Sequence, residues 1–202
     1  MSLAAQYPLI LASASAARAR LLAAAGVAAR SEPAGIDESE IKRGYRRKDE
    51  QAEACAAALA EAKAVAVSRR HQNLLVIGAD QILSCDGEWF DKPRDIAEAR
   101  AQLERLRGRS HELASAVAVV RDGAPAWRHV ERARLTMRRF SDGFLDDYLA
   151  AMGEELTFTV GGYALEGLGA RLFDTVEGDY FAILGLPLLP LLKYLRSEGV
   201  LA

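Results

Sequence analysis

The sequence predicts an α/β protein with a mixed, twisted sheet flanked by helices. Short apolar runs of strand length alternate along the chain with longer segments rich in Ala, Leu, Glu and Arg, which are good helix formers. Asp86-Gly87 and Asp122-Gly123 separate further strand-like runs, and such pairs are typical of hairpin turns. Strand–helix alternation mixed with hairpins indicates a mixed rather than a purely parallel sheet.

The start of the chain predicts a strand, a turn and a helix. The apolar run over residues 8–12 has the length of a buried strand. Ser13-Ala14-Ser15 supplies helix-capping side chains for a helix over 16–25, and Gly26 stands where a helix C-terminal glycine is expected.

The remaining elements follow from the same signals. Asp37 and Glu40 have the spacing of a capping box and open a second helix. We expect these further helices: 49–70, 95–107, 141–152 and 187–197. We expect these further strands: 74–79 ending at Asp80, the hairpin 82–90, 111–121, 126–140, 171–176 and 180–184.

The organisation along the chain is that of one domain over residues 1–202, without an internal repeat or an obvious linker. The polar stretch 30–53 and the hairpin region 110–140 are the segments that could form a second lobe.

Composition restricts the class of protein. The chain has 202 residues, is 50% hydrophobic and carries a net charge of −2, so it can bury a sizeable core but lacks the basic excess of a nucleic-acid binder. Cys55 and Cys85 form no CxxC pair, which favours a reducing compartment over a disulfide framework. The N-terminus has no basic region before its apolar run, and no run reaches membrane-spanning length, so we expect a cytoplasmic protein without a membrane anchor.

The turn between the first strand and helix is a candidate phosphate site. Ser13, Ser15 and small neighbours leave backbone N–H groups exposed at the positive end of a helix, and Arg18 adds a charged donor. The alternative is an ordinary N-cap beside a surface arginine.

Acidic and basic side chains elsewhere fit the same chemistry. Asp80, after a buried strand, could hold a divalent metal or activate water, or only cap the following turn. Lys92, before a proline, suits a phosphate or a developing negative charge, or is a solvated loop lysine. Glu38 could join a metal site and Lys63 could contribute a cation, although a helix cap and a solvated helix position explain them equally.

Taken together and in order, these segments resemble the Maf family of nucleoside triphosphate pyrophosphatases. The matching segments, which span nearly the whole chain, are LILASAS (9–15) with Arg18, IDE (36–38), EAKA (61–64), VIGAD (76–80), DKP (91–93), LRGRSH (106–111), GGYALEG (161–167), EGDY (177–180) and LGLPL (184–188). The chain lacks the GxxxxGK[ST] loop, the GxSxG elbow and the HExxH pair of other hydrolases.

The resemblance implies a fold, an activity and a site. The implied fold is Maf/ITPase-like, with two lobes and a central cleft, and the implied activity is hydrolysis of the α–β bond of nucleoside triphosphates to a monophosphate and pyrophosphate. It further implies a divalent cation, Mg²⁺ or Mn²⁺, and a homodimer. Asp80 would be the proton acceptor, and the remaining polar site would be formed by Ser13, Arg18, Glu38, Lys63 and Lys92.

Three positions bear on the base preference. The sequence has Ala17, Gln81 and Glu166 where the commonest family pattern has Arg, Thr and Gln, and Gln81 and Glu166 resemble the branch that acts on 7-methyl-GTP. A glutamate can accept hydrogen bonds from guanine N1–H and the exocyclic amine, and its charge suits a cationic methylated base. Ala17 departs from that branch, which often has a bulky residue there, so the base preference stays open.

Two other functions remain as alternatives. Because family members are linked to arrest of cell division, one alternative is a non-enzymatic regulator of septum formation, which would need a partner-sized apolar surface. The other is a nucleic-acid binder using the basic run 43–48, although few aromatic residues are available for stacking.

Overall fold

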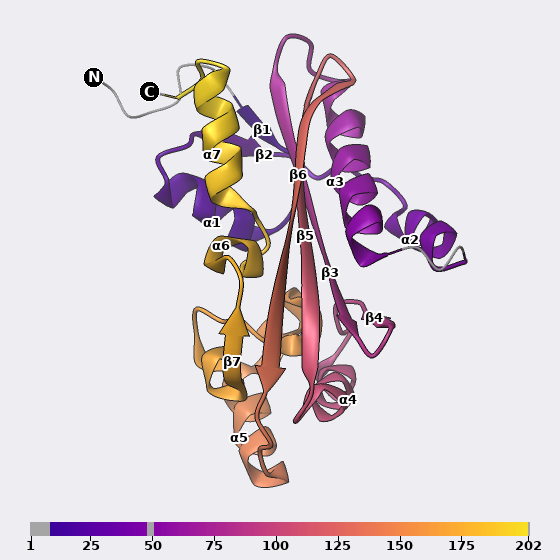
Figure 1. Ribbon diagram of the computed structural model, residues 1–202, viewed down its shortest axis with the longest axis vertical. Coiled ribbons are helices and arrows are strands. Elements are labelled where there is room, and N and C mark those ends of the chain that lie inside the picture. The colour runs from indigo at the N-terminus through magenta and orange to yellow at the C-terminus, as the bar shows by residue number, and fades with distance from the viewer. Residues whose placement is uncertain (1–8, 48–50, 202) are drawn as a thin grey trace. The chain divides into compact units, whose positions relative to one another are not determined.

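The computed structural model describes residues 9–47 and 51–201 (Figure 1). The strands are β1 (Leu9–Leu11), β2 (Ala29–Ser31), β3 (Leu75–Cys85), β4 (Glu88–Phe90), β5 (Ser110–Arg121), β6 (Ala124–Met137) and β7 (Phe173–Glu177). The helices are α1 (Ala16–Ala24), α2 (Glu38–Arg47), α3 (Ala52–Ser68), α4 (Ile96–Leu106), α5 (Asp142–Met152), α6 (Tyr180–Ile183) and α7 (Leu188–Ser197). Short 3-10 helices are η1 (Gly153–Phe158), η2 (Val160–Gly162) and η3 (Leu168–Leu172).

The strands form one mixed sheet, as the sequence predicts. Its order is β2-β1-β3-β5-β6-β7, and β4 pairs with β3 off this path. β1 is parallel to β2 and β3, whereas β4 is antiparallel to β3 and β7 is antiparallel to β6. Helices precede or follow most strands, so the α/β class is confirmed.

The chain divides into two compact units that share the long strands β3, β5 and β6. Unit 1 comprises residues up to 81, 115–131 and those from 179 onward, and unit 2 comprises 82–114 and 132–178. The prediction that residues 30–53 and 110–140 form the second lobe is therefore wrong. The described residues of the stretch 30–53 belong to unit 1, and the 110–140 hairpin is divided because its two strands are long enough to serve both units.

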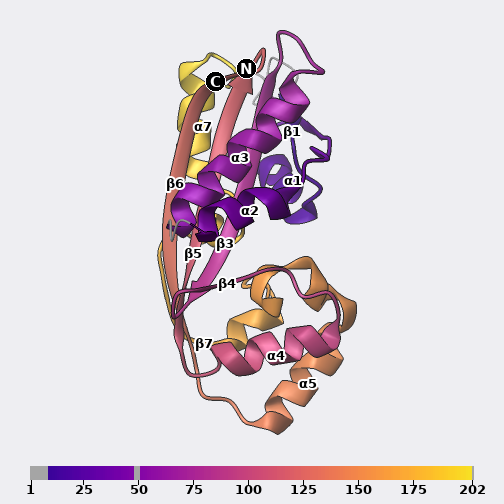
Figure 2. The same cartoon turned by 90° about the vertical axis from the view of Figure 1, so that its right-hand side faces the viewer.

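Unit 1 has helices on both faces of its strands (Figures 1 and 2). Side chains alternate between the two faces along β1 and β3, as the strand geometry requires. One face packs with α1 and α7 in a core that contains Leu9, Leu11, Leu22, Ile77, Ala79, Val119, Leu191 and Leu195. The other face packs with α3 in a core of Ile10, Ala12, Ala64, Val67, Val76 and Val120.

Gly78 allows α3 to pack very closely against β3. A Cβ atom added at Gly78 would lie 2.0 Å from the carbonyl oxygen of Ala60 and 2.9 Å from Cβ of Ala64. Only a residue without a side chain fits this contact. The helix contributes small residues to the same contact, since Ala56, Ala60 and Ala64 are fully buried.

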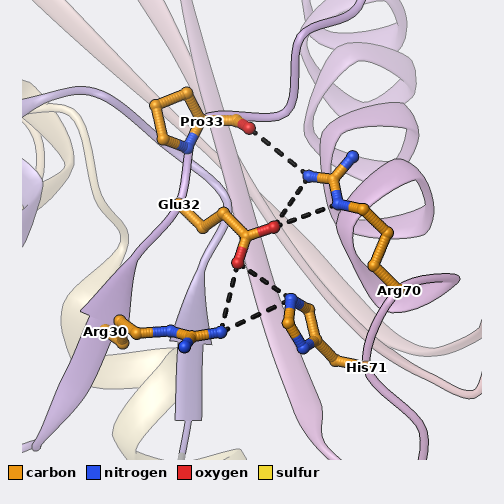
Figure 3. Close-up of polar contacts among 5 residues, drawn as sticks. All are labelled: Arg30, Glu32, Pro33, Arg70 and His71. Carbon is orange, nitrogen blue, oxygen red and sulfur yellow. Dashed lines mark hydrogen bonds and ion pairs between the residues drawn. The ribbon is translucent and has the colours of Figure 1, made fainter.

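A partly exposed cluster of ion pairs in unit 1 links the end of β2 to the turn that follows α3 (Figure 3). The carboxylate of Glu32 accepts a hydrogen bond from Arg70 Nε at 3.0 Å and lies 2.8 Å from His71 Nε2 and 3.2 Å from Arg30 Nη2. The hydrogen bond from Arg70 is the main cause that lowers the pKa of Glu32. Because these groups are solvated, we assign the cluster a local tethering role.

Unit 2 is built around α4 and α5 and the 3-10 segments that follow α5. Both helices begin as predicted: Asp95 Oδ1 accepts a hydrogen bond from Glu98 N at 2.7 Å, and Ser141 Oγ accepts one from Phe144 N at 3.2 Å. Cys85 of unit 2 and Cys55 of unit 1 are both buried.

Two predicted strands differ in the structure because of contacts made in the folded chain. The strand predicted over 180–184 is the helix α6, because Asp179 caps it by accepting a hydrogen bond from Ala182 N at 2.7 Å. The strand predicted to end before Asp80 instead continues to Cys85, because β3 pairs with β4 beyond the point where β1 ends. A short apolar run alone does not distinguish these outcomes.

The other predicted elements are confirmed within three residues at each end, apart from ends that the structure does not describe. The long helix predicted over 49–70 is α3, and its predicted start at Asp49 lies outside the described residues, as does Lys48 of the basic run. Pro187 is the N-cap of α7 rather than its first helical residue. Among the described residues, no helix has the length and apolar character needed to cross a membrane.

Candidate functional site

A buried lysine in unit 1 contacts two carboxylates. Lys63 Nζ lies 2.5 Å from Asp80 Oδ1 and 2.9 Å from Glu38 Oε1. The side chains of Lys63 and Asp80 are only 10% and 7% exposed, whereas that of Glu38 is 44% exposed. The structure therefore brings together three of the predicted site residues, and it gives the group one solvent-facing member.

The fold explains why these three side chains meet. Asp80 is on the same face of β3 as Val76 and Gly78, which is the face covered by α3. Its neighbour β1 stops pairing with β3 at Ile77, so Asp80 lies beyond the carboxyl end of a parallel strand, where ligand crevices of α/β sheets form. Lys63 comes from α3, which packs closely here, and Glu38 is the first residue of α2, which packs on α3.

One oxygen of Asp80 has no hydrogen-bond partner among the described residues. Asp80 Oδ1 accepts the hydrogen bond from Lys63, but Oδ2 is buried and unpartnered. A buried carboxylate oxygen without a donor is costly, because it has lost its hydration without replacement. An unpartnered oxygen of this kind is typical of a carboxylate that accepts a proton from water or binds a cation when the substrate is present.

The turn before α1 has the predicted capping geometry. Ser15 is the N-cap and its Oγ accepts a hydrogen bond from Arg18 N at 3.4 Å. Ser13 Oγ accepts a hydrogen bond from Ser15 N at 3.1 Å. The N-cap interpretation of Ser15 is thus confirmed, and phosphate binding at the same turn stays a prediction.

Arg18 is not a surface arginine, because it is held against the polypeptide backbone. Its Nε donates to the carbonyl of Gly185 at 2.7 Å and its Nη1 donates to the carbonyl of Ala79 at 2.9 Å. Burial lowers the pKa of the Arg18 guanidinium, and the charges of Asp80 and Glu38 oppose this shift. Nη2 donates no hydrogen bond to any residue that the structure describes, so this end of the fork is available for an anion.

The side chain of Gln81 binds to the backbone of a neighbouring segment. Its Nε2 donates to the carbonyls of Ala182 and Ile183 at 3.0 and 3.1 Å and to Ser115 Oγ at 2.8 Å. Ser115 Oγ in turn donates to the carbonyl of Ala182 at 2.7 Å. These bonds fix the helix α6, which directly precedes the Gly185 carbonyl bound by Arg18.

The remaining predicted residues lie in separate local settings. Ala17 is half-buried in the first turn of α1. Lys92 and Glu166 belong to unit 2, where both are exposed: Lys92 lies between β4 and α4, and Glu166 lies between η2 and η3. Across the part of the chain that the structure describes, no three His, Cys, Asp or Glu side chains gather as metal ligands.

Sequence reasoning missed the supporting residues of this site. Gly78 is essential for the approach of α3, and its place two residues before Asp80 in a buried run is a sequence signal for close backbone contact. Ser115 and the carbonyls of Ala79 and Gly185 carry no local signal, since they act only through contacts made in the folded chain.

Fold and site together define an α/β protein whose buried acid–lysine centre lies just beyond the end of the parallel strand β1, with a capped helix N-terminus and an arginine bound to backbone carbonyls in the same unit. The model of the family described as Maf-like protein matches residues 8–198. The chain belongs to this family, as the resemblance of its motifs indicated.

Relatives with assigned names are similar over nearly the full length. A protein of Paramagnetospirillum magneticum named nucleoside triphosphate pyrophosphatase is 54% identical over 95% of this chain and 99% of its own length. One of the same name from Granulibacter bethesdensis is 51% identical over 96% of this chain and 98% of its own. A protein of Rhizobium meliloti named 7-methyl-GTP pyrophosphatase is 48% identical over 96% of this chain and 97% of its own.

Proposed function

We propose that this protein hydrolyses the α–β phosphoanhydride of nucleoside triphosphates and releases a nucleoside monophosphate and pyrophosphate. The observation that carries the proposal is the group formed by Glu38, Lys63 and Asp80, in which one buried oxygen of Asp80 is unpartnered. The names of relatives about half identical to this chain support the same activity and favour an enzyme over a non-enzymatic regulator of septum formation.

Asp80 is the proton acceptor in this proposal. A water molecule attacks the α-phosphorus, its proton passes to Asp80 Oδ2, and the bond from the α-phosphorus to the bridging oxygen breaks with pyrophosphate as leaving group. Lys63 holds Oδ1 at 2.5 Å and so fixes the direction in which Oδ2 presents its lone pairs. Orientation of the acceptor before the reaction is a main source of catalytic advantage in such sites.

Cationic groups and N–H donors bind the triphosphate. Arg18 offers Nη2, and the turn at Ser13 and Ser15 offers backbone N–H groups at the start of α1. Lys63 contributes charge from within the site, and we propose Lys92 as a further phosphate contact. Electrostatic contacts of this kind act mainly on the charge that develops during phosphoryl transfer.

Glu38 and Asp80 are suited to hold a divalent cation, Mg²⁺ or Mn²⁺. Carboxylate oxygens are the preferred ligands of Mg²⁺, which usually takes one or two of them together with phosphate oxygens and water. The half-exposed carboxylate of Glu38 fits that donor set, and the carboxylate of Asp80 would add to it. When bound, the cation would neutralise phosphate charge and polarise the reacting phosphoryl group.

We propose a modified guanine nucleotide, 7-methyl-GTP, as the candidate substrate. Glu166 is exposed and its carboxylate can accept hydrogen bonds from guanine N1–H and the exocyclic amine. Gln81, whose Nε2 is already bound to α6, would act on specificity by fixing that segment, and Ala17 would act through its small side chain. The name of the relative from Rhizobium meliloti supports this substrate class.

A panel of triphosphates with product analysis tests the function. The purified protein is incubated with Mg²⁺ and each of GTP, 7-methyl-GTP, UTP, dTTP and ATP, and the products are separated by ion-exchange chromatography. We expect monophosphate and pyrophosphate in equal amounts, with the highest kcat/KM for 7-methyl-GTP. Diphosphate and inorganic phosphate as first products, or no turnover with any nucleotide, would refute the proposal.

The proposal also covers the location, the oligomeric state and the partners of the enzyme. We propose that the enzyme acts in the cytoplasm on free nucleotides, as a homodimer, without a nucleic-acid partner. Family resemblance supports the dimer, and the net charge of −2 supports the lack of a nucleic-acid partner. Light scattering after gel filtration measures the oligomeric state directly.

A further inference from the structure

A buried histidine in unit 2 is outside the chemistry described so far. His111, at the start of β5, is 1% exposed, and its Nε2 lies 2.8 Å from the hydroxyl of Tyr163. Which of the two donates depends on the imidazole tautomer. The rings of His111, Tyr163 and Phe173 pack together, with Tyr163 edge-on to Phe173 at 4.9 Å between centroids.

Packing alone does not explain a polar pair at this position. His111 Nδ1 has no hydrogen-bond partner among the described residues, although it is buried. Two phenyl rings would fill a similar volume without that desolvation cost. Desolvation lowers the pKa of His111 to about 4, so the imidazole is neutral near pH 7 and does not serve there as a charged group. Unlike two apolar rings, His111 and Tyr163 are joined by a directional hydrogen bond.

Tyr163 anchors the segment that carries Glu166. Immediately after Tyr163, Gly167 N donates to the carbonyl of Ala164 at 3.2 Å, which closes a turn with Glu166 at its third position. A Cβ atom at Gly169 would lie 2.4 Å from the carbonyl oxygen of Ala164, so the following chain packs directly on this turn.

The residue directly before Tyr163 is fixed as well. Tyr148 of α5 donates from its hydroxyl to the carbonyl of Gly162 at 3.0 Å. Gly161 and Gly162 both have positive φ, which other residues rarely adopt. Glu166 therefore lies at the exposed tip of a turn that directly follows a segment held by two buried tyrosines.

We propose that the hydrogen bond between His111 and Tyr163 is a positioning device that fixes Glu166 and thereby sets the preference of the enzyme for one nucleobase over another. The inference rests on the proposed function, and it makes His111 and Tyr163 positioning residues rather than catalytic residues. A misplaced Glu166 loses hydrogen bonds to the base, while groups that act on the triphosphate are unaffected. The pair should act on selectivity through KM and should leave kcat nearly unchanged.

Tyr163→Phe, which removes one oxygen, is the central variant, and His111→Gln is the conservative one, since its amide can still bond to the Tyr163 hydroxyl. Tyr194→Phe removes a hydroxyl in unit 1, and Leu135→Val weakens a buried position of unit 2 in β6, outside the segment that carries Glu166. Glu166→Gln gives the selectivity expected when recognition by the carboxylate is lost. For each protein, kcat and KM are measured with 7-methyl-GTP, GTP and UTP, beside the melting temperature.

We expect Tyr163→Phe to lower the ratio of kcat/KM for 7-methyl-GTP over UTP by about tenfold, which corresponds to about 1.4 kcal/mol, through a higher KM for 7-methyl-GTP. His111→Gln should keep most of the wild-type ratio, and the two control variants should keep all of it. An unchanged ratio in Tyr163→Phe overturns this inference alone, as does a wild-type protein that hydrolyses all bases equally well. Failure of both Tyr163→Phe and His111→Gln to fold assigns the pair to stability and also overturns it, whereas a folded wild-type protein with no turnover refutes the proposed function itself.

Discussion

Lys63 and Asp80 form the closest contact of the candidate site, with Nζ 2.5 Å from Oδ1 and both side chains nearly buried. The contact joins a helix to the middle of a strand, and it leaves the second oxygen of Asp80 without a partner among the described residues. Lys63 also contacts Glu38, so one ammonium group orients two carboxylates. Their separate roles can be distinguished by substitution.

Asp80→Asn should remove most of the activity and leave the fold intact. The amide is nearly the same size as the carboxylate and can still accept a hydrogen bond from Lys63, but it cannot take a proton from water. Loss of a general base typically costs about 100- to 10 000-fold in rate. Steady-state pyrophosphate release measures the loss, and circular dichroism measures the fold.

Asp122→Asn is the matched control for this substitution. Asp122 lies in unit 1 at the turn between β5 and β6, where its Oδ1 accepts a hydrogen bond from Asn73 N. Asparagine can make the same bond and tolerates the positive φ of this position. We expect wild-type turnover from this variant, and wild-type turnover from Asp80→Asn would contradict the role assigned to Asp80.

Lys63→Met should destabilise the protein more than Asp80→Asn does. Removing the lysine leaves the carboxylate of Asp80 buried without its counter-charge, and breaking such a buried pair typically costs about 3–5 kcal/mol. The double variant Lys63→Met/Asp80→Asn leaves no unpaired carboxylate buried at position 80, and it should regain part of that stability. Urea unfolding at pH 7 measures both changes. Additive effects of the two substitutions would show that the contact contributes little.

The sequence predicts most of the local structure because its signals are local. Ser15 and Ser141 cap helices through bonds to residues three positions later, so their role follows from the sequence alone. Lys63 shows the opposite case. In an Ala-rich helix it has the pattern of a solvated position, and it becomes buried only because Gly78 lets α3 pack closely on the sheet.

Arg18→Lys should weaken substrate binding although it keeps the positive charge. Arg18 donates in two directions at once, to the carbonyls of Gly185 and Ala79, while Nη2 stays available. Lysine is a point charge and cannot maintain that planar fork. We expect a KM for the triphosphate raised by about tenfold or more, together with a lower melting temperature, since a hydrogen bond to a charged group contributes about 1.5–3 kcal/mol.

Arg20→Lys tests whether the planar guanidinium of Arg18, rather than positive charge anywhere on α1, is needed for substrate binding. Arg20 is in the same helix and is exposed. Its replacement should change neither KM nor the melting temperature measurably. Equal effects of the two substitutions would place the role of Arg18 in the general charge of the helix.

Removal of divalent cations should abolish turnover reversibly. Dialysis against EDTA followed by titration with Mg²⁺ or Mn²⁺ tests the proposal that Glu38 and Asp80 bind a cation with the substrate. In Glu38→Gln, half-saturation should need more Mg²⁺, because Mg²⁺ usually has only one or two carboxylate ligands and this variant loses one. Full activity in excess EDTA would refute the proposed metal dependence.

The convergence of the site could be predicted only from family resemblance. No local pattern links Glu38, Lys63 and Asp80, which come from two helices and a strand. Asp80 was expected at the end of a strand, and the structure instead places it inside β3, beyond the end of β1. Asp80 thus lies beyond the carboxyl end of a parallel strand, but the strand that ends is its neighbour β1, while β3 continues.

His111 should make the stability of the protein depend on pH in the acidic range. Desolvation lowers its pKa from 6.5 to about 4 in the folded protein, so the unfolded chain binds a proton at a higher pH than the folded chain does. The stabilising effect of the neutral imidazole is complete above pH 6.5 and is lost as the pH falls toward 4, with a total of roughly 3 kcal/mol. Carboxylates such as Asp142, whose pKa is lowered by the hydrogen bond from Arg107, lose their stabilising effect at lower pH, and comparison of wild type with His111→Gln separates the two contributions. Urea unfolding at pH 7.5, 6 and 4.5 should show a steeper loss in wild type than in the variant, and parallel losses in the two proteins would mean that His111 is protonated as readily in the folded state as in the unfolded chain.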